Sequence, residues 1–280
     1  MEKFGESIET SFDAAAFGWF DGMHKGHRAV LERLSKYRNP VVVLFPDDSE
    51  EVVYTEAEKK YVLKSFGIEN VICGSCDSYD DLNLRTFVAD TLVGGLGVGQ
   101  IVIGENCPGL TKLCEVCKEF GVAVEIVPTV KDNDKAVTTD LVRTSLRAGN
   151  IEECIGLLGG AFVICGEVVH GKGVGKKHGL PTANLQYACN KVWPKHGVYG
   201  ARVCVGEALG KINKGMTNIG LRPSDDESDV PTCETFILDF DRDIYGTCIT
   251  LELFKYVRPV IKFSSLDEVK AQVEKDIKSI

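Results

Sequence analysis

The 280-residue chain lacks any apolar run that is long enough to span a membrane. Its first residues, 1–7, lack the apolar segment of a signal peptide. It also lacks an excess of positive charge, because 32 Lys and Arg stand against 41 Asp and Glu, for a net charge of −9. Non-specific nucleic-acid binding needs a basic surface. These absences predict a cytoplasmic protein without a membrane or nucleic-acid partner.

Two common nucleotide-binding motifs are also missing. Residues 166–173 have nearly the spacing of a Walker A loop, but Gly173 stands where Ser or Thr must hold Mg²⁺. Residues 94–99 imitate a dinucleotide fingerprint, yet they precede the apolar run 101–103 instead of following a strand. Both interpretations are rejected.

The eleven cysteines do not form a recognisable zinc pattern. The pairs Cys73/Cys76 and Cys114/Cys117 are separated by 37 residues, whereas zinc ribbons leave about 15–20. We therefore expect reduced thiols, most of them small core residues.

Length and composition favour two globular domains, since 44% of the residues are hydrophobic and 26% charged. We place the boundary between residues 158 and 159. In residues 1–158, apolar strands alternate with helical patterns, which predicts a doubly wound parallel sheet. The expected strands are 14–17, 40–45, 71–72, 101–103 and 122–127, and the expected helices are 28–37, 55–66, 84–93, 110–120 and a connector at 146–158.

In residues 159–280, short alternating runs predict an antiparallel barrel. A single helix follows, and its start is marked by the capping box Ser265-x-x-Glu268.

A glycine- and lysine-rich stretch from Gly171 to Leu185 is the strongest candidate site in the second domain. Backbone amides next to glycine can approach an anion closely, and lysines add positive charge. The expected phosphate-binding residues are Gly171, Lys172, Gly173, Gly175 and Lys176. Pro181 is expected to open a turn that presents Thr182 and Asn184, whose hard oxygens suit Mg²⁺. A solvent-exposed Gly/Lys turn is the alternative.

The first domain carries His24 and His27 in a strand, Gly-rich turn and helix context. A helix N-terminus with added imidazoles can hold a triphosphate and stabilise charge on leaving pyrophosphate. Further along, Thr138 and Thr139 can cap a helix while Arg143 holds a phosphate. Surface histidines and a plain helix cap are the alternatives.

Both halves resemble one family, the prokaryotic bifunctional riboflavin kinase/FMN adenylyltransferase, or FAD synthetase. In the second half the resemblance rests on the Gly-Lys-Gly-x-Gly loop and on the segments 181–184, 197–199, 218–223, 243–246, 258–263 and 272–276. It implies Mg²⁺ and phosphate binding by Thr182 and Asn184, a general base at Glu234, and flavin contacts from Asn218 and Arg222.

In the first half the resemblance rests on Gly18-x-Phe-Asp-Gly-x-His24-x-Gly-His27, on the Gly-Glu-Asn turn at 104–106 and on segment 138–143. It implies that FMN phosphate attacks the α-phosphorus of ATP, with His24 and His27 as catalytic residues. The implied nucleotide-binding residues are Gly18, Phe20, Asp21, Gly22, Gly26, Asn106, Thr138, Thr139 and Arg143.

This half also departs from the family pattern. Trp19 replaces the usual Asn, and Asp47 and Asp48 stand where the family has a Pro-His-Pro segment. Two carboxylates would repel a polyphosphate unless Mg²⁺ or a lysine intervenes.

The sequence therefore predicts an enzyme that makes FMN and then FAD from riboflavin and ATP with Mg²⁺, as a monomer or weak homo-oligomer. The alternatives are a riboflavin kinase with a degenerate amino-terminal domain, a non-catalytic flavin carrier, and an unrelated nucleotidyltransferase, which would leave the second half unexplained.

Overall fold

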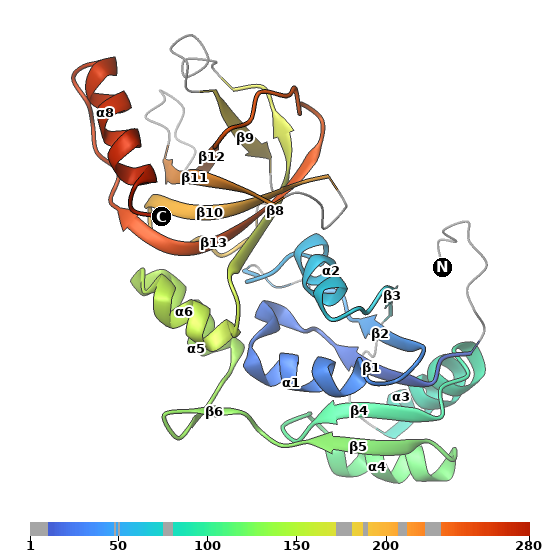
Figure 1. Cartoon of the computed structure of the whole chain (residues 1–280). Coiled ribbons are helices and arrows are strands. Elements are labelled where there is room, and N and C mark those ends of the chain that lie inside the picture. The colour runs from blue at the N-terminus through green and yellow to red at the C-terminus, as the bar shows by residue number, and fades with distance from the viewer. Residues whose placement is uncertain are drawn as a thin grey trace. The chain divides into compact units, whose positions relative to one another are not determined.

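The computed structural model describes residues 11–47, 49, 51–74, 81–171, 181–186, 190–206, 212–221 and 231–280. Backbone contacts divide the chain into two compact units, coloured along the chain in Figure 1. The first unit comprises residues 1–48 and 59–138, and the second comprises 49–58 and 139–280. Residues 139–158 therefore belong to the second compact unit. The domain boundary at 158/159 was drawn from the sequence pattern and stays a prediction.

The first unit contains the expected parallel sheet of five strands in the order β3-β2-β1-β4-β5. The strands are β1 (Ala14–Gly18), β2 (Pro40–Leu44), β3 (Asn70–Cys73), β4 (Gln100–Gly104) and β5 (Ala123–Val127). The order reverses direction between β1 and β4, so the carboxyl ends of these two strands form the edge at which ligands bind in such sheets.

Helices cover both faces of this sheet. Alternate strand residues such as Phe17 and Val43 pack with α3 (Asp81–Thr86), the π-helical segment η2 (Phe87–Gly95) and α4 (Leu110–Glu119). The other alternation, including the buried Ala16, faces α1 (Lys25–Leu34). The helix predicted at 84–93 is thus divided into an α-helical and a π-helical part.

A short hairpin and two helices follow the sheet in sequence. The hairpin of β6 (Lys131–Asp132) and β7 (Lys135–Ala136) turns through Asn133 and Asp134, both with positive φ, as a tight two-residue hairpin turn requires. Helices α5 (Thr139–Ala148) and α6 (Ile151–Leu158) replace the single connector predicted at 146–158. Gly149, with φ +80°, ends α5 because this left-handed conformation cannot continue a helix.

The second unit contains a closed antiparallel barrel with the strand order β10-β11-β12-β9-β8-β13, as predicted. Its strands are β8 (Phe162–Val169), β9 (Thr182–Gln186), β10 (Gly197–Val205), β11 (Ile212–Leu221), β12 (Pro231–Ile237) and β13 (Cys248–Arg258).

The turn predicted at residues 181–184 is wrong, because Thr182–Gln186 forms strand β9. Ala183 and Leu185 are buried, while Thr182 and Asn184 alternate with them on the opposite face. The alternation pairs β9 with β12 on one side and β8 on the other, and this burial outweighs the local turn tendency of Pro181 and the polar residues.

The capping box at the terminal helix α8 (Leu266–Ile277) is confirmed, since the Glu268 N–H donates to Ser265 Oγ at 3.3 Å. The helix is held to the barrel by Asp276, which accepts from Arg258 Nε at 2.8 Å and Gln272 Nε2 at 2.6 Å. Two of the segments on which the family resemblance rests, 258–263 and 272–276, are therefore in direct contact.

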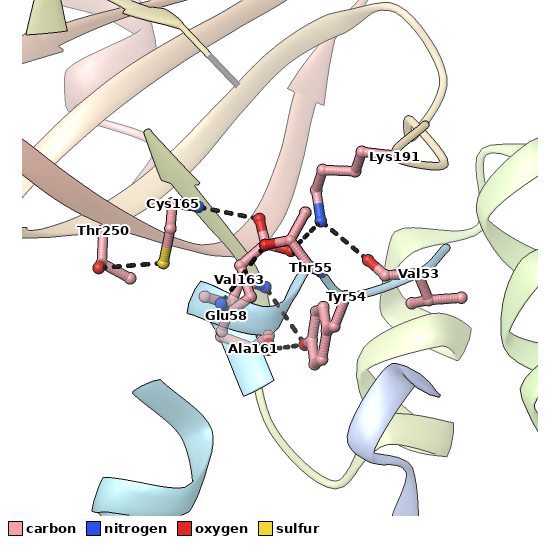
Figure 2. A network of polar contacts seen from close by, with 9 residues as sticks. All are labelled: Val53, Tyr54, Thr55, Glu58, Ala161, Val163, Cys165, Lys191 and Thr250. Carbon is pink, nitrogen blue, oxygen red and sulfur yellow. Dashed lines mark hydrogen bonds and ion pairs between the residues drawn. The ribbon is translucent and has the colours of Figure 1, made fainter. Parts of the chain in front are cut away.

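Residues 49–58 are joined to the barrel by a buried ion pair between Glu58, in the first turn of α2 (Glu56–Ser65), and Lys191 (Figure 2). Lys191 Nζ lies 2.7 Å from Glu58 Oε2, and both side chains are 0% exposed. The carboxylate also accepts the N–H groups of Thr55 and Cys165, at 2.8 and 2.9 Å. Lys191 in turn donates to the Val53 carbonyl at 2.8 Å.

Tyr54 adds a second connection beside this ion pair. Its hydroxyl donates to the Ala161 carbonyl at 3.1 Å and accepts the Val163 N–H at 3.2 Å, at the start of β8 (Figure 2). Lys191 Nζ lies 4.7 Å from the Phe162 ring centroid and 5.3 Å from that of Tyr54, so aromatic faces complete the enclosure of the charge.

Removing one member of this pair should be costly because the other charge would stay buried. We expect Lys191→Met to lower the free energy of unfolding by about 3–5 kcal/mol. The double variant Glu58→Gln/Lys191→Met should recover much of the loss, since the Gln amide keeps an acceptor for Cys165. Urea unfolding followed by circular dichroism measures both changes.

The matched control is Arg202→Met, which removes a partly exposed ion pair with Glu252 on the same barrel. It should cost about 1 kcal/mol or less. Equal losses for Lys191→Met and Arg202→Met would contradict the importance of the buried pair.

Candidate functional site

The loop after β1 has a backbone that only a few residue types allow. Gly18 has φ +142° and Gly22 φ +76°, and Phe20 between them is also left-handed at +49°. The chain then forms a short 3-10 turn, Asp21–Met23, and enters α1 directly. This geometry accounts for the glycines of the histidine motif, and it places His24 at the N-cap of α1 and His27 in its first turn.

The two histidines stack on each other at this helix start. Their ring centroids lie 3.8 Å apart with an interplanar angle of 20°, and Phe20 lies 5.3 Å from the His27 ring. His24 Nδ1 accepts the Gly26 N–H at 3.1 Å and so caps the helix. A Cβ on Gly26 would lie 3.0 Å from His24 Cε1, so a larger residue here would press on the His24 ring and displace it from the present stack.

Burial keeps both imidazoles neutral at pH 7. It lowers the pKa of His24 to about 4, against a smaller opposing effect of Asp21. Burial, followed by the nearby His24 and Lys59, lowers the pKa of His27 well below 6.5. Because His24 Nδ1 accepts a hydrogen bond, its proton is on Nε2, which makes Nε2 a donor for a ligand. The site can therefore stabilise phosphate oxygens by neutral hydrogen bonds.

His27 Nδ1 is buried and has no hydrogen-bond partner within the described part of the chain. A buried polar nitrogen in this state is costly unless something binds it. This supports the prediction that the pair receives a polar ligand.

Asp47 and Lys59 lie in the same unit as the histidines. Lys59 Nζ is 3.9 Å from Asp47 Oδ2, and the lysine side chain is only 5% exposed. The charge of Lys59 also acts on His27. Sequence reasoning missed Lys59, because one lysine in the charged helix α2 carries no distinguishing pattern. Asp48 lies outside the described residues.

The other predicted nucleotide-binding residues are distributed over the loop after β1, the end of β4 and the start of α5. Asp21 is buried in the loop, and the exposed Asn106 lies just beyond the carboxyl end of β4. Thr138 ends the first unit, while Thr139 and Arg143 belong to α5 of the second. Arg143 Nη1 lies 3.2 Å from Asp140 Oδ1. The nucleotide contacts of these residues stay predictions.

Trp19, which replaces the family's usual Asn, lies beside the same loop. Its ring meets that of Phe45, the residue after β2, edge to face at a centroid distance of 5.5 Å. The side chain is 41% exposed. It therefore presents an aromatic surface at the ligand-binding edge of the sheet.

The barrel brings four predicted residues to one face. Asn218 on β11 is the register partner of Glu234 on β12, which is the partner of Asn184 on β9. Directly paired side chains lie about 4.5–5.5 Å apart. Thr182, two residues before Asn184, points to the same face. The Glu234 carboxylate is thus flanked by the side-chain amides of Asn218 and Asn184, and the Thr182 hydroxyl lies on the same face.

Gly171 closes one end of this row. A Cβ on Gly171 would collide with the Asn184 amide, so the glycine lets the chain pass over that side chain. The other predicted loop residues (Lys172, Gly173, Gly175 and Lys176) and Arg222 lie outside the described residues.

His170, next to Gly171, is a residue that the sequence did not single out. Its ring stacks on Tyr245 of the 243–246 segment, with centroids 3.8 Å apart. The contact joins the end of β8 to the loop before β13, which are separated by 75 residues along the chain.

The prediction that most cysteines are core residues is correct only in part, because four of the nine described cysteines are buried, while Cys73 and Cys248 are exposed. None of these nine forms a disulfide bond, and no group of three or more His, Cys, Asp or Glu among the described residues is placed to hold a metal. Burial raises the pKa of Cys117 to about 11 and those of Cys154 and Cys165 to about 12, so these thiols stay protonated. Cys76 of the first pair lies outside the described residues.

A parallel sheet with a histidine-capped helix, followed by a six-stranded barrel with a Glu-centred polar row, defines a two-domain transferase. The family model "FAD synthetase" matches residues 8–141, and "Riboflavin kinase" matches residues 158–280. The chain belongs to the bifunctional riboflavin kinase/FMN adenylyltransferase family, and both of the family's domains are present. This confirms the resemblance drawn from the motifs.

Relatives align over nearly the whole chain. The enzyme of Escherichia coli K12 is 33% identical, over 92% of this chain and 88% of that protein. The enzyme of Bacillus subtilis 168 is 27% identical, over 96% and 91%.

Among solved structures, one titled as a macrolide-efflux protein from Streptococcus pneumoniae is 26% identical, with a TM-score of 0.71 over 96% of this chain and 93% of that one. In this chain, none of the helices within the described ranges is long and apolar enough to cross a membrane.

The neutral histidines predict a loss of stability in acid. Since the folded-state pKa of His24 is lowered, unfolding binds protons, and stability should fall as the pH drops from about 6.5 towards 4, by on the order of 2–3 kcal/mol. His24→Asn keeps a helix-capping oxygen but cannot titrate there, so it should lose less. Urea midpoints at pH 7, 6 and 5 measure this difference.

The exposed His196 provides the control, and His196→Asn should retain the full acid sensitivity of the unmodified chain. Identical pH profiles for His24→Asn and the unmodified chain would rule out His24 as a source of the acid loss.

Proposed function

We propose that this chain catalyses two successive reactions: phosphorylation of riboflavin by ATP to give FMN, and adenylylation of FMN by ATP to give FAD. The observation that carries the proposal is the row Asn184–Glu234–Asn218 on one face of the barrel. The stacked histidine pair at the edge of the parallel sheet supports the second reaction.

In the kinase reaction, Glu234 accepts the proton of the ribityl 5′-hydroxyl as that oxygen attacks the γ-phosphorus of ATP. Asn218 is positioned beside Glu234 to orient the flavin substrate. The hydroxyl of Thr182 and the amide oxygen of Asn184 are hard donors on the same face, so they fit Mg²⁺. Bound there, the ion would neutralise phosphate charge.

In the adenylyl transfer, FMN phosphate displaces pyrophosphate from the α-phosphorus of ATP. His24 Nε2 donates a hydrogen bond to a phosphate oxygen, and His27 completes the donor set at the start of α1. Hydrogen bonds that are already in place need no rearrangement as charge moves to the pyrophosphate. Positioning then supplies the remaining acceleration without a covalent intermediate.

The proposal includes the predicted cytoplasmic location and a monomer or weak homo-oligomer. The riboflavin kinase with an inactive first domain is the second candidate, because Asp47 and Trp19 depart from the family pattern. The proximity of Lys59 to Asp47 favours the bifunctional enzyme, since it supplies the lysine that the two carboxylates require.

Glu234→Gln should reduce FMN formation from riboflavin by about 10²–10⁴-fold, the contribution typical of a general base. ATP binding and FAD formation from supplied FMN should persist. Glu167→Gln is the matched control, since Glu167 is an exposed glutamate on barrel strand β8, which β9 separates from β12. Full kinase activity in Glu234→Gln would remove this residue as the base.

His27→Ala should stop FAD formation from FMN while FMN formation from riboflavin continues. Purified protein with ATP and Mg²⁺ is given riboflavin in one tube and FMN in another, and the flavins are separated chromatographically. A parallel fall of both products in His27→Ala would contradict two separate sites. FMN without FAD from the unmodified chain would favour the second candidate function.

A further inference from the structure

The first unit contains a buried lysine whose role the proposed reactions leave open. Lys59 is the fourth residue of α2, and 95% of its side-chain surface is removed from water. Asp47, just beyond the carboxyl end of β2, lies 3.9 Å from its ammonium nitrogen and is itself mostly buried. A buried ammonium needs compensation by opposite charge or strong hydrogen bonds.

The contact with Asp47 differs from the other buried pair of this chain. Glu58 and Lys191 approach to 2.7 Å, with two backbone N–H groups and a carbonyl completing their shells. At 3.9 Å, Lys59 and Asp47 are beyond hydrogen-bonding distance of each other, so the attraction is purely electrostatic. A ligand anion that takes the place of this carboxylate would therefore break no hydrogen bond between these two side-chain atoms.

The surroundings of Lys59 indicate which anion this would be. Its charge acts on His27, whose buried Nδ1 has no hydrogen-bond partner among the described residues. The neutral histidine pair can donate hydrogen bonds but supplies no positive charge. Adenylyl transfer, by contrast, joins two polyanions, and their repulsion must be offset by fixed positive charge.

We propose that Lys59 binds a phosphate oxygen of the adenylyl-transfer reactants, and that Asp47 is its counter-ion when no substrate is present. The proposal rests on the proposed adenylyl transfer and adds a charged residue to the histidine site. Lys59 then supplies positive charge in place of the cation that is lost where Asp47 and Asp48 replace the family's Pro-His-Pro segment.

The test compares Lys59→Met and Lys59→Arg in steady-state FAD formation, with FMN and ATP varied in turn. Loss of a charge-assisted hydrogen bond of about 1.5–3 kcal/mol corresponds to a fall of roughly 10–100-fold in kcat/KM. A raised KM for FMN alone identifies the FMN phosphate, and a raised KM for ATP alone identifies the triphosphate. A lowered kcat with both KM values unchanged identifies charge that develops in the transition state. Lys59→Arg, which keeps the charge, should retain at least a tenth of the activity.

Lys64→Met is the matched control, because Lys64 is an exposed lysine five residues further along the same helix. It should leave both reactions within twofold of the unmodified chain. Circular dichroism and urea unfolding of the same samples report whether each variant is folded. If Lys59→Met fails that criterion, Lys59→Gln replaces it as the neutral variant.

Calorimetric titration with FAD separates this proposal from the proposed function. FAD carries two phosphates and is the product of adenylyl transfer alone, so its affinity can be measured even if the chain forms no FAD. We expect a Kd roughly 10-fold or more higher for Lys59→Met than for Lys64→Met. Unchanged FAD affinity together with unchanged kcat and KM values in a folded Lys59→Met would overturn the proposal.

Discussion

The second unit depends on the ion pair between Glu58 and Lys191, which joins three separate parts of the sequence. The segment 49–58 is held to the start of β8 through the Cys165 N–H, and to the segment before β10 through Lys191. All of these groups are satisfied at once, which is the condition under which a buried charge pair is tolerated. The unit that carries Glu234 therefore includes residues 49–58, a segment that ends in the first turn of α2.

The buried ionisable groups of the first unit are compensated in a different way from the Glu58–Lys191 pair. There the histidines are kept neutral by burial, and a Cβ at Gly26 would press on the His24 ring of their stack. The nearby ammonium of Lys59 lies 3.9 Å from the carboxylate of Asp47. The fully enclosed pair stabilises the fold, whereas the Lys59–Asp47 pair and the neutral imidazoles carry the proposed anion site.

The elements that could be predicted from the sequence are those whose cause lies in a local pattern of residues. The continuous apolar run of β2, the capping box of α8 and the glycine turn before His24 each contain their structural cause within a few residues. Strand β9 was not predicted, because Pro181 and three polar residues resemble a turn until β8 and β12 are present to pair with it. The Lys59–Asp47 and Glu58–Lys191 pairs were also missed, since each depends on a partner that no local pattern identifies.

Because residues 49–58 belong to the second unit, the two units can fold only in a certain order during synthesis. Glu58 leaves the ribosome 133 residues ahead of Lys191. At about 5–20 residues per second, that interval lasts roughly 7–27 s. The parallel sheet can form in that time, because the last of its strands ends at Val127. During synthesis the carboxylate of Glu58 must therefore stay hydrated, and the final closure of the barrel unit recruits a segment made long before it.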